Sequence, residues 1–186
     1  MKKILQKDAP VLRKIAENVP IDSIGTKEVS KIIDEMKETL WSQDDGVAIA
    51  APQIGYPLRI FVVSKRVWTI IKDDKKDKSE SETPEDTGLD MVFINPVIKK
   101  ISKKRNLVEE GCLSVRYLYG KVSRANQVKI EAYTEDGKKF ERGGTGLLAQ
   151  IFQHETDHLD GILFIDTATD LEDLPPEKPN INKKDD

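Results

Sequence analysis

The segment Leu147–Gly161, LLAQIFQHETDHLDG, constrains the fold more than any other stretch of the chain. Its apolar residues recur at helical spacing, which predicts an amphipathic helix that stops at Gly161. The only two histidines of the chain, His154 and His158, lie four residues apart on the apolar stripe. Residues with this spacing point the same way on a helix, so both imidazoles are expected to face the core. A buried polar group without a partner costs about 1–3 kcal/mol, and a shared metal ion would satisfy both rings at once.

His154, Glu155 and His158 form the pattern HExxH, which is typical of two metal ligands and a general base on one helix. Glu155 is turned by about 100° from His154. It is therefore poorly placed as a third ligand and well placed to reach a water on the metal. The pattern is short, so two histidines held by hydrogen bonds alone are an alternative at this point of the argument.

A third ligand must come from elsewhere, because the chain has no other histidine. The only cysteine, Cys112, stands in EEGCLSV, Glu109–Val115, at a break between apolar segments. A lone cysteine is often a small buried hydrophobe. One thiolate and two imidazoles would instead leave a fourth tetrahedral position for water, which is the arrangement of a catalytic site. Zn²⁺, Ni²⁺, Co²⁺ and Fe²⁺ all suit such ligands.

Length and composition limit the class of protein. The 186 residues predict one domain with a substantial core. A net charge of −3 gives no reason to expect a specific nucleic-acid partner, and no apolar run is long enough to predict a membrane span. The single cysteine excludes an internal disulfide framework and favours a reducing compartment. No signal peptide is recognised at the N-terminus.

The expected elements follow the order helix, several strands, helix, which is typical of an α+β domain. Thr26 is the expected N-cap of an amphipathic helix that ends near Trp41. Strands are expected at 58–63, at 91–98 with an interruption at Pro96, and at 162–166. Residues 128–142 are expected to form a hairpin that turns at Asp136–Gly137. We therefore expect antiparallel or mixed sheets packed around the histidine helix.

Two segments are expected to lie outside this core. Residues 72–86 contain no apolar side chain, which predicts a solvated, mobile loop over 72–90. Residues 171–186 are rich in proline and charge and are expected to form a flexible tail. The predicted catalytic domain is thus 1–170.

Three segments resemble, in order, the motifs of the peptide deformylase family: GVAIAAPQ at 46–53, EGCLS at 110–114 and QHETDHLDG at 153–161. The resemblance covers nearly all of the chain except the charged loop and the tail. The chain departs from the family pattern at Ala48, where a glycine is expected, and at Arg116, where a proline usually stands. Both departures concern substrate fit and loop shape rather than the ligands.

The resemblance implies removal of the formyl group from the N-terminal formyl-methionine of newly made polypeptides, at the ribosome, with release of formate. Cys112, His154 and His158 would hold the metal. Fe²⁺ is the family's native ion, with Zn²⁺ or Ni²⁺ as alternatives. A metal-bound water would be the nucleophile, and Glu155 the general acid and base.

The resemblance also implies how the substrate is held. Gln53 and the Leu113 backbone N–H would donate to the oxyanion. The peptide would add as a strand along the first motif. Arg124 would pair with Glu110 or Asp157 behind the ligands. The residues expected in the substrate site are Gly46, Val47, Ala48, Glu110, Leu147, Gln150 and Ile151.

Two further readings stay open at this point. An HExxH metalloprotease that cuts internal peptide bonds is the alternative enzyme, and a protein with a closed structural metal site is the alternative outside enzymes. The lack of a transit peptide favours a bacterial cytoplasm and leaves an organelle, after processing, open.

Overall fold

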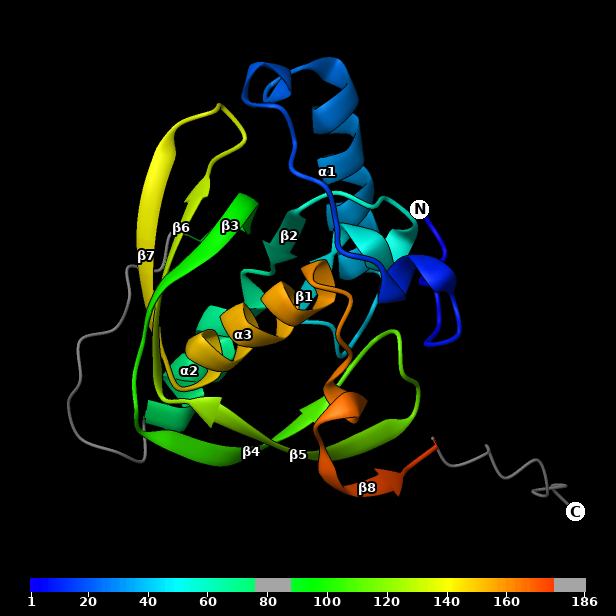
Figure 1. Ribbon diagram of the computed structural model, residues 1–186, viewed down its shortest axis with the longest axis vertical. Helices are drawn as coiled ribbons and strands as arrows, with labels where there is room; N and C mark the ends of the chain where they lie inside the picture. Colours follow the sequence, from blue (N-terminus) through cyan, green and yellow to red (C-terminus); the bar gives the residue numbers. More distant parts are fainter. Residues whose placement is uncertain (76–87, 176–186) are drawn as a thin grey trace, which may run out of the picture.

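The structure, a computed structural model, describes residues 1–75 and 88–175 (Figure 1). In this part of the chain all strand pairs are antiparallel, and they form a five-stranded and a three-stranded sheet. The last helix, α3 (Leu147–Leu159), contacts strands of both sheets and lies at the centre of the molecule (Figure 1). The expectation of an α+β domain around the histidine helix is confirmed.

The elements have the following bounds. The two remaining α-helices are α1 (Lys27–Trp41) and α2 (Arg66–Lys75). The larger sheet has the order β1-β2-β3-β6-β7, with β1 (Ala48–Ala50), β2 (Ile60–Val63), β3 (Met91–Ile101), β6 (Gln127–Tyr133) and β7 (Lys139–Thr145). The smaller sheet has the order β4-β5-β8, with β4 (Arg105–Gly111), β5 (Leu118–Ala125) and β8 (Thr169–Asp173). Short 3-10 helices are η1 (Pro10–Arg13), η2 (Ile21–Ser23), η3 (Ala51–Ile54) and η4 (Phe164–Asp166).

Local sequence signals set the ends of α1 and α3. Thr26 caps α1 as expected, because its side chain accepts a hydrogen bond from the Val29 N–H. Helix α3 ends just before Gly161, whose φ of +76° favours glycine. A Cβ at Gly161 would lie 2.9 Å from the Arg13 backbone. Glycine therefore both stops α3 and lets the chain pass close to η1.

Strands β1 and β2 are buried on both faces. Phe61 and Val63 contact the cluster around α3, whereas Ile60 and Val62 contact the cluster around α1. Side chains alternate between the two faces of a strand, so α1 and α3 cover opposite faces of this part of the sheet. This explains why the segment IFVV is a continuous apolar run rather than an alternating one.

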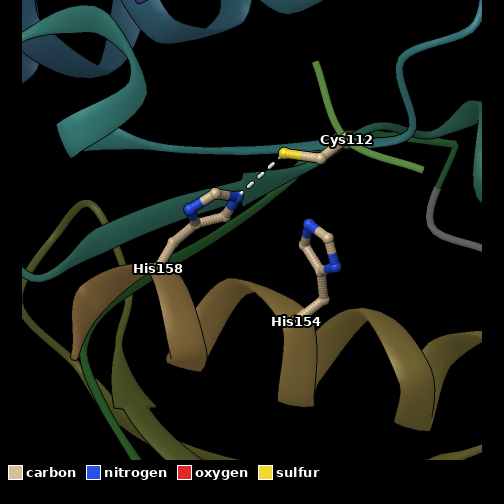
Figure 2. A group of neighbouring side chains, drawn as sticks. All are labelled: Cys112, His154 and His158. Atoms are coloured by element: carbon tan, nitrogen blue, oxygen red, sulfur yellow. Dashed lines mark hydrogen bonds between the residues drawn. The ribbon is translucent and has the colours of Figure 1, made fainter. Parts of the chain in front are cut away.

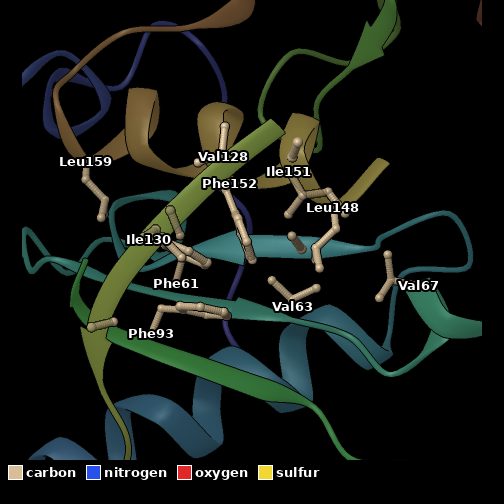
Figure 3. Close-up of a cluster of buried hydrophobic side chains, with 14 of the residues drawn as sticks. Phe61, Val63, Val67, Phe93, Val128, Ile130, Leu148, Ile151, Phe152 and Leu159 are labelled. Atoms are coloured by element: carbon tan, nitrogen blue, oxygen red, sulfur yellow. The ribbon is translucent and has the colours of Figure 1, made fainter. Parts of the chain in front are cut away.

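Three phenylalanines join α3 to the larger sheet (Figure 3). Phe61 and Phe93 stack with ring centroids 4.5 Å apart, and Phe152 of α3 approaches Phe93 edge-on at 5.2 Å. All three side chains are fully buried. Because Phe152 lies two residues before His154, this packing fixes the helix that carries both histidines.

The predicted strands around Pro96 and the predicted hairpin are confirmed. β3 is interrupted by a shift of register between Ile94 and Val97, since proline cannot donate to the ladder. Asn95 adopts φ +50° there, and its side chain bonds both backbone groups of Val19. β6 and β7 pair from Gln127 opposite Thr145 to Tyr133 opposite Lys139.

The end of the chain differs from the prediction. Residues 162–166 form no strand; Phe164–Asp166 is the 3-10 helix η4, in which Asp166 accepts a hydrogen bond from the Leu163 N–H. The last strand is β8, which begins two residues before the predicted tail and pairs with β5. Every residue of β8 is exposed, so it lacks the alternation that identifies a strand in a sequence.

The predicted charged loop also begins too early. α2 continues to Lys75, so residues 72–75 are helical. Val67, Trp68 and Ile71 anchor the preceding turns of this helix in the core. The rest of the predicted loop up to residue 87, and the tail from 176, lie outside the described residues. Among the described helices, none is long and apolar enough to cross a membrane.

We predict that Phe152→Ala lowers the free energy of unfolding by about 3–5 kcal/mol, because it leaves a cavity between α3 and the larger sheet. Urea unfolding measures this loss. Leu107→Ala is the matched control, because Leu107 is 59% exposed and its truncation is expected to change stability by less than about 0.5 kcal/mol. Equal small effects of both variants would contradict the central role of the phenylalanine cluster.

Candidate active site

Cys112, His154 and His158 converge in space. Cys112 directly follows β4, and both histidines project from the same side of α3 toward it (Figure 2). The Cys112 Sγ lies 3.2 Å from His158 Nε2, and the three potential ligand atoms lie within 4.8 Å of one another. The expected third ligand is therefore brought to the histidine pair from a segment more than 40 residues away.

The chemistry of these three residues fits a metal ion. A thiolate and two imidazoles are ligands that zinc and ferrous iron both accept. His154 Nδ1 bonds Glu110 Oε2 at 3.0 Å, which leaves Nε2 as the nitrogen that could bind a metal. Burial lowers the pKa of His154, but its hydrogen bonds with Cys112 and Glu110 outweigh burial and raise that pKa well above the usual value. Surroundings that stabilise the positive charge of a proton on His154 also stabilise the positive charge of a metal ion bound to this ring.

His158 differs from His154 in its protonation. Burial, which is almost complete, lowers the pKa of His158 well below its usual value, and the positive charge of His154 adds to this effect. The ring is therefore held neutral, the form in which an imidazole binds a metal.

Glu110 and Arg124 form a buried network behind His154. Arg124 donates from Nε and Nη2 to the two Glu110 carboxylate oxygens at 2.7 and 3.0 Å, and from Nη1 to Asp157 Oδ2 at 2.6 Å. Burial would raise the pKa of Glu110, but hydrogen bonds from His154 and Arg124 outweigh it and hold this pKa at about 2. Arg124 thus pairs with both predicted partners, not with one of them.

This network changes the expected role of Glu110. Glu110 lies in the wall of the cleft described below, but its carboxylate is hydrogen-bonded by Arg124 and His154. The side chain therefore orients His154, and both of its oxygens are already hydrogen-bonded.

Glu155 has surroundings suited to proton transfer. It lies in the wall of the cleft, is 4% exposed, and has no hydrogen-bond partner for its Oε2 among the described residues. Burial raises the pKa of its carboxyl to about 7, and a cation held nearby would lower that pKa again. A proton acceptor of this kind can exchange a proton near neutral pH.

A cleft of about 280 Å³ leads to Cys112 and His154, which lie in its wall. Within the described residues, β1 and β4 each end their sheet, so each has one edge without a strand partner, and residues of both lie in the wall of this cleft. All seven residues expected in the substrate site lie in this wall, as do Gln53 and Leu113. An extended peptide could therefore bind between two free strand edges.

The side chain of Gln53 is fixed beside Cys112. Its Oε1 accepts from the Ala50 N–H at 2.8 Å, and its Nε2 donates to Ser114 Oγ at 3.1 Å. The same Nε2 lies 3.6 Å from Cys112 Sγ. The amide nitrogen is thus held beside Cys112 by a side chain that cannot rotate freely.

Sequence reasoning missed Ser114 and Gln153. Ser114 is fully buried and orients Gln53, as described. Gln153 bonds both the N–H and the carbonyl of Ala125, at 2.9 and 3.0 Å, and so ties α3 to β5. Both residues stand inside the quoted motifs, although no catalytic role was expected of either. Their position in these motifs was the signal that could have pointed to a supporting role.

Comparison with known proteins identifies the family. A family model described as polypeptide deformylase matches residues 1–173. The chain belongs to the peptide deformylase family. The resemblance expected from the three motifs is confirmed.

Individual peptide deformylases agree with this assignment. Peptide deformylase 2 of Clostridium acetobutylicum is 35% identical over 171 residues, which cover 91% of this chain and 97% of that protein. Peptide deformylase 1A, chloroplastic, of Solanum lycopersicum is 37% identical over 166 residues, covering 89% of this chain. The chain spans only 59% of the length of that tomato relative.

A solved structure shows the same fold. It is a class I type b peptide deformylase from Acinetobacter baumannii with Met-Ala-Ser bound. It is 32% identical, has a TM-score of 0.74, and covers 89% of this chain and 98% of its own.

We predict that Arg124→Gln weakens metal retention and lowers the free energy of unfolding by about 3–5 kcal/mol, because it leaves the Glu110 carboxylate buried without its partner. Metal content after gel filtration and urea unfolding measure the two effects. Arg105→Gln is the control, since Arg105 is exposed and bonds only Ser123 among the described residues. If Arg124→Gln does not fold, Asp157→Asn tests the same network more mildly. Normal metal retention in both variants would contradict the orienting role.

Proposed function

We propose that this protein is a metal-dependent peptide deformylase. It hydrolyses the formyl group from the N-terminal formyl-methionine of newly made polypeptides, at or near the ribosome, and releases formate. The observation that carries the proposal is the convergence of Cys112, His154 and His158 at a cleft bordered by two free strand edges. The family, whose name refers to removal of formyl groups, favours this reaction over cleavage of internal peptide bonds.

The residues that would hold the metal are Cys112, His154 and His158. When bound, the ion polarises the formyl oxygen and lowers the pKa of water from 15.7 to about 7. Glu155 accepts the proton of the attacking water and passes it to the amine nitrogen that departs. The C–N bond of the formamide breaks, and the products are formate and a free amino terminus.

The oxyanion that develops on the formyl oxygen needs hydrogen-bond donors. Gln53 Nε2 is supported in this role by its fixed orientation beside Cys112. The Leu113 backbone N–H, adjacent to Cys112 in the chain, is the second proposed donor. Removing one donor of this kind costs about 10²–10³ in rate in other hydrolases.

The substrate is proposed to bind as an extended strand between Gly46–Ala48 and the end of β4. The free edge of β1 is available for this pairing, because β2 occupies only its other side. Val47, Leu147 and Ile151 supply an apolar wall for the methionine side chain. Met-Ala-Ser, bound to the Acinetobacter relative, starts with the same residue as the proposed product.

The catalytic unit is proposed to run through β8 rather than to end at residue 170. β8 pairs with β5, and the family match ends at the last residue of β8. The proposed compartment is one in which formylated proteins are made. This is a bacterial cytoplasm or an organelle, in keeping with the bacterial and chloroplastic relatives.

The reaction can be tested directly. The purified protein, loaded with metal under anaerobic conditions, is expected to release formate from formyl-Met-Ala-Ser and to leave unformylated Met-Ala-Ser-containing peptides intact. Formate is measured by a coupled dehydrogenase assay and peptide cleavage by mass spectrometry. Cleavage of internal bonds without formate release would support the metalloprotease instead.

We predict that Glu155→Gln retains the metal and loses nearly all formate release, because the amide can take no proton from water. Metal content and turnover are measured on the same sample. Glu172→Gln, on exposed β8, is the control and is expected to behave like the parent. A Glu155→Gln protein that purified without metal would make Glu155 a ligand and overturn its role.

We propose Fe²⁺ as the native ion, with Zn²⁺ or Ni²⁺ as substitutes, on the basis of the family resemblance. We predict that iron-loaded protein loses activity in air faster than nickel-loaded protein, because oxidants formed from oxygen at ferrous iron carry the Cys112 thiolate to the sulfinate. Activity over time and mass spectra of the Cys112 peptide measure this. Equal decay with unmodified Cys112 would exclude a ferrous thiolate site.

A further inference from the structure

The segment Ser42–Gly46 leads from α1 into the strand edge proposed to bind peptide. We propose that Arg116 is a positioning residue that, through Asp45 and Gln43, fixes this segment and so sets how well longer peptides bind. The inference rests on the proposed function and extends it to a residue that departs from the family pattern.

Arg116 joins two segments of the cleft wall. Its guanidinium forms a bidentate pair with Asp45, with Nη1 on Oδ2 and Nη2 on Oδ1 at 3.0 Å, and Nη2 also reaches Gln43 Oε1 at 3.2 Å. Arg116 and Asp45 lie on opposite segments of the cleft wall, 71 residues apart in the chain. A proline, the usual residue at this position, could make none of these contacts.

A second arginine bonds the backbone within this segment and just before it. Arg66, the first residue of α2, donates from Nη1 to the Gln43 carbonyl and from Nη2 to the Trp41 carbonyl at 3.1 Å. Arg66 therefore fixes the backbone of the segment, while Arg116 fixes its side chains. Together they leave the segment little freedom to move relative to the Cys112 loop.

The position of the segment affects the site through the close packing around Gly46. A Cβ at Gly46 would lie 2.9 Å from Leu40, 3.1 Å from Gln43 and 3.3 Å from Leu113. The segment is thus packed closely against the side chain of Leu113, whose backbone N–H is a proposed oxyanion donor, at the point where the segment enters the strand edge. Movement of Asp45, the neighbour of Gly46, would shift the edge relative to the metal ligands.

The Arg116–Asp45 ion pair is half-buried, with exposed side-chain fractions of 25% and 54%. Exposed ion pairs add little to global stability. Loss of the pair is therefore expected to affect the local geometry of the edge more than the fold. The effect should grow with the number of peptide residues that pair with that edge, because each added residue depends on its alignment.

The test compares two substrates, formyl-Met-Ala-Ser and formyl-methionine amide. Arg116→Ala is expected to raise KM for the tripeptide by about tenfold, with kcat within about threefold, and to change both constants for the amide by less than about threefold. Arg116→Lys keeps the positive charge but cannot form the bidentate pair, so its KM for the tripeptide should rise less than that of Arg116→Ala. Asp45→Asn should resemble Arg116→Ala, and the double variant should be no worse than either single one.

Arg59→Ala is the matched control. Arg59 pairs with Asp160 at similar exposure, 16% and 44%, and neither residue lies in the cleft wall. This variant should leave the ratio of the two substrates' kcat/KM values unchanged. Metal content and melting temperature are recorded for every variant.

The outcomes separate the inference from the proposed function. A parent protein that releases no formate from either substrate contradicts the proposed function. An active parent whose Arg116→Ala variant keeps the parent's substrate ratio overturns the inference. Equal loss of kcat on both substrates, with loss of metal or a lower melting temperature, also overturns it, because Arg116 would then support the metal site or the fold.

Discussion

The packing of α3 against the larger sheet is the contact on which the site depends. Phe152 packs edge-on against Phe93 and lies 6.4 Å from the ring of Phe61, and it stands on the same helix as both histidines. On the other side, Arg124 of β5 pairs with Asp157 of α3 and with Glu110, which orients His154. The helix is thus held by apolar contacts toward one sheet and by buried charges toward the other.

The two sheets therefore contribute different parts of the core and of the candidate site. The larger sheet buries most of the core and brings the edge of β1 to the cleft. The smaller sheet delivers Cys112 at the end of β4 and supplies Arg124 from β5. A peptide bound between β1 and β4 would connect the two sheets, so its affinity depends on how firmly each edge is held.

The sequence predicted what depends on local pattern and missed what depends on tertiary contact. Thr26 and Gly161 marked helix ends because capping by a side-chain oxygen and a positive φ at glycine are local properties of the backbone. The strand β8 was missed because its exposed residues carry no alternation and its pairing with β5 depends on tertiary structure. The contact between Arg116 and Asp45 was missed for a similar reason, since nothing near either residue indicates that two distant loops meet.

The placement of the two free edges also bears on aggregation. An open strand edge can recruit another chain, and proteins commonly guard such edges with charge. The outer strands β7 and β8 carry charged residues. They are Lys139, Glu141 and Arg142 on β7, and Asp170, Glu172 and Asp173 on β8. Residues of β1 and β4 instead lie in the wall of the cleft, where the proposed substrate would bind. A peptide bound there, as proposed, would cover these two edges and so replace charge as their protection against another chain.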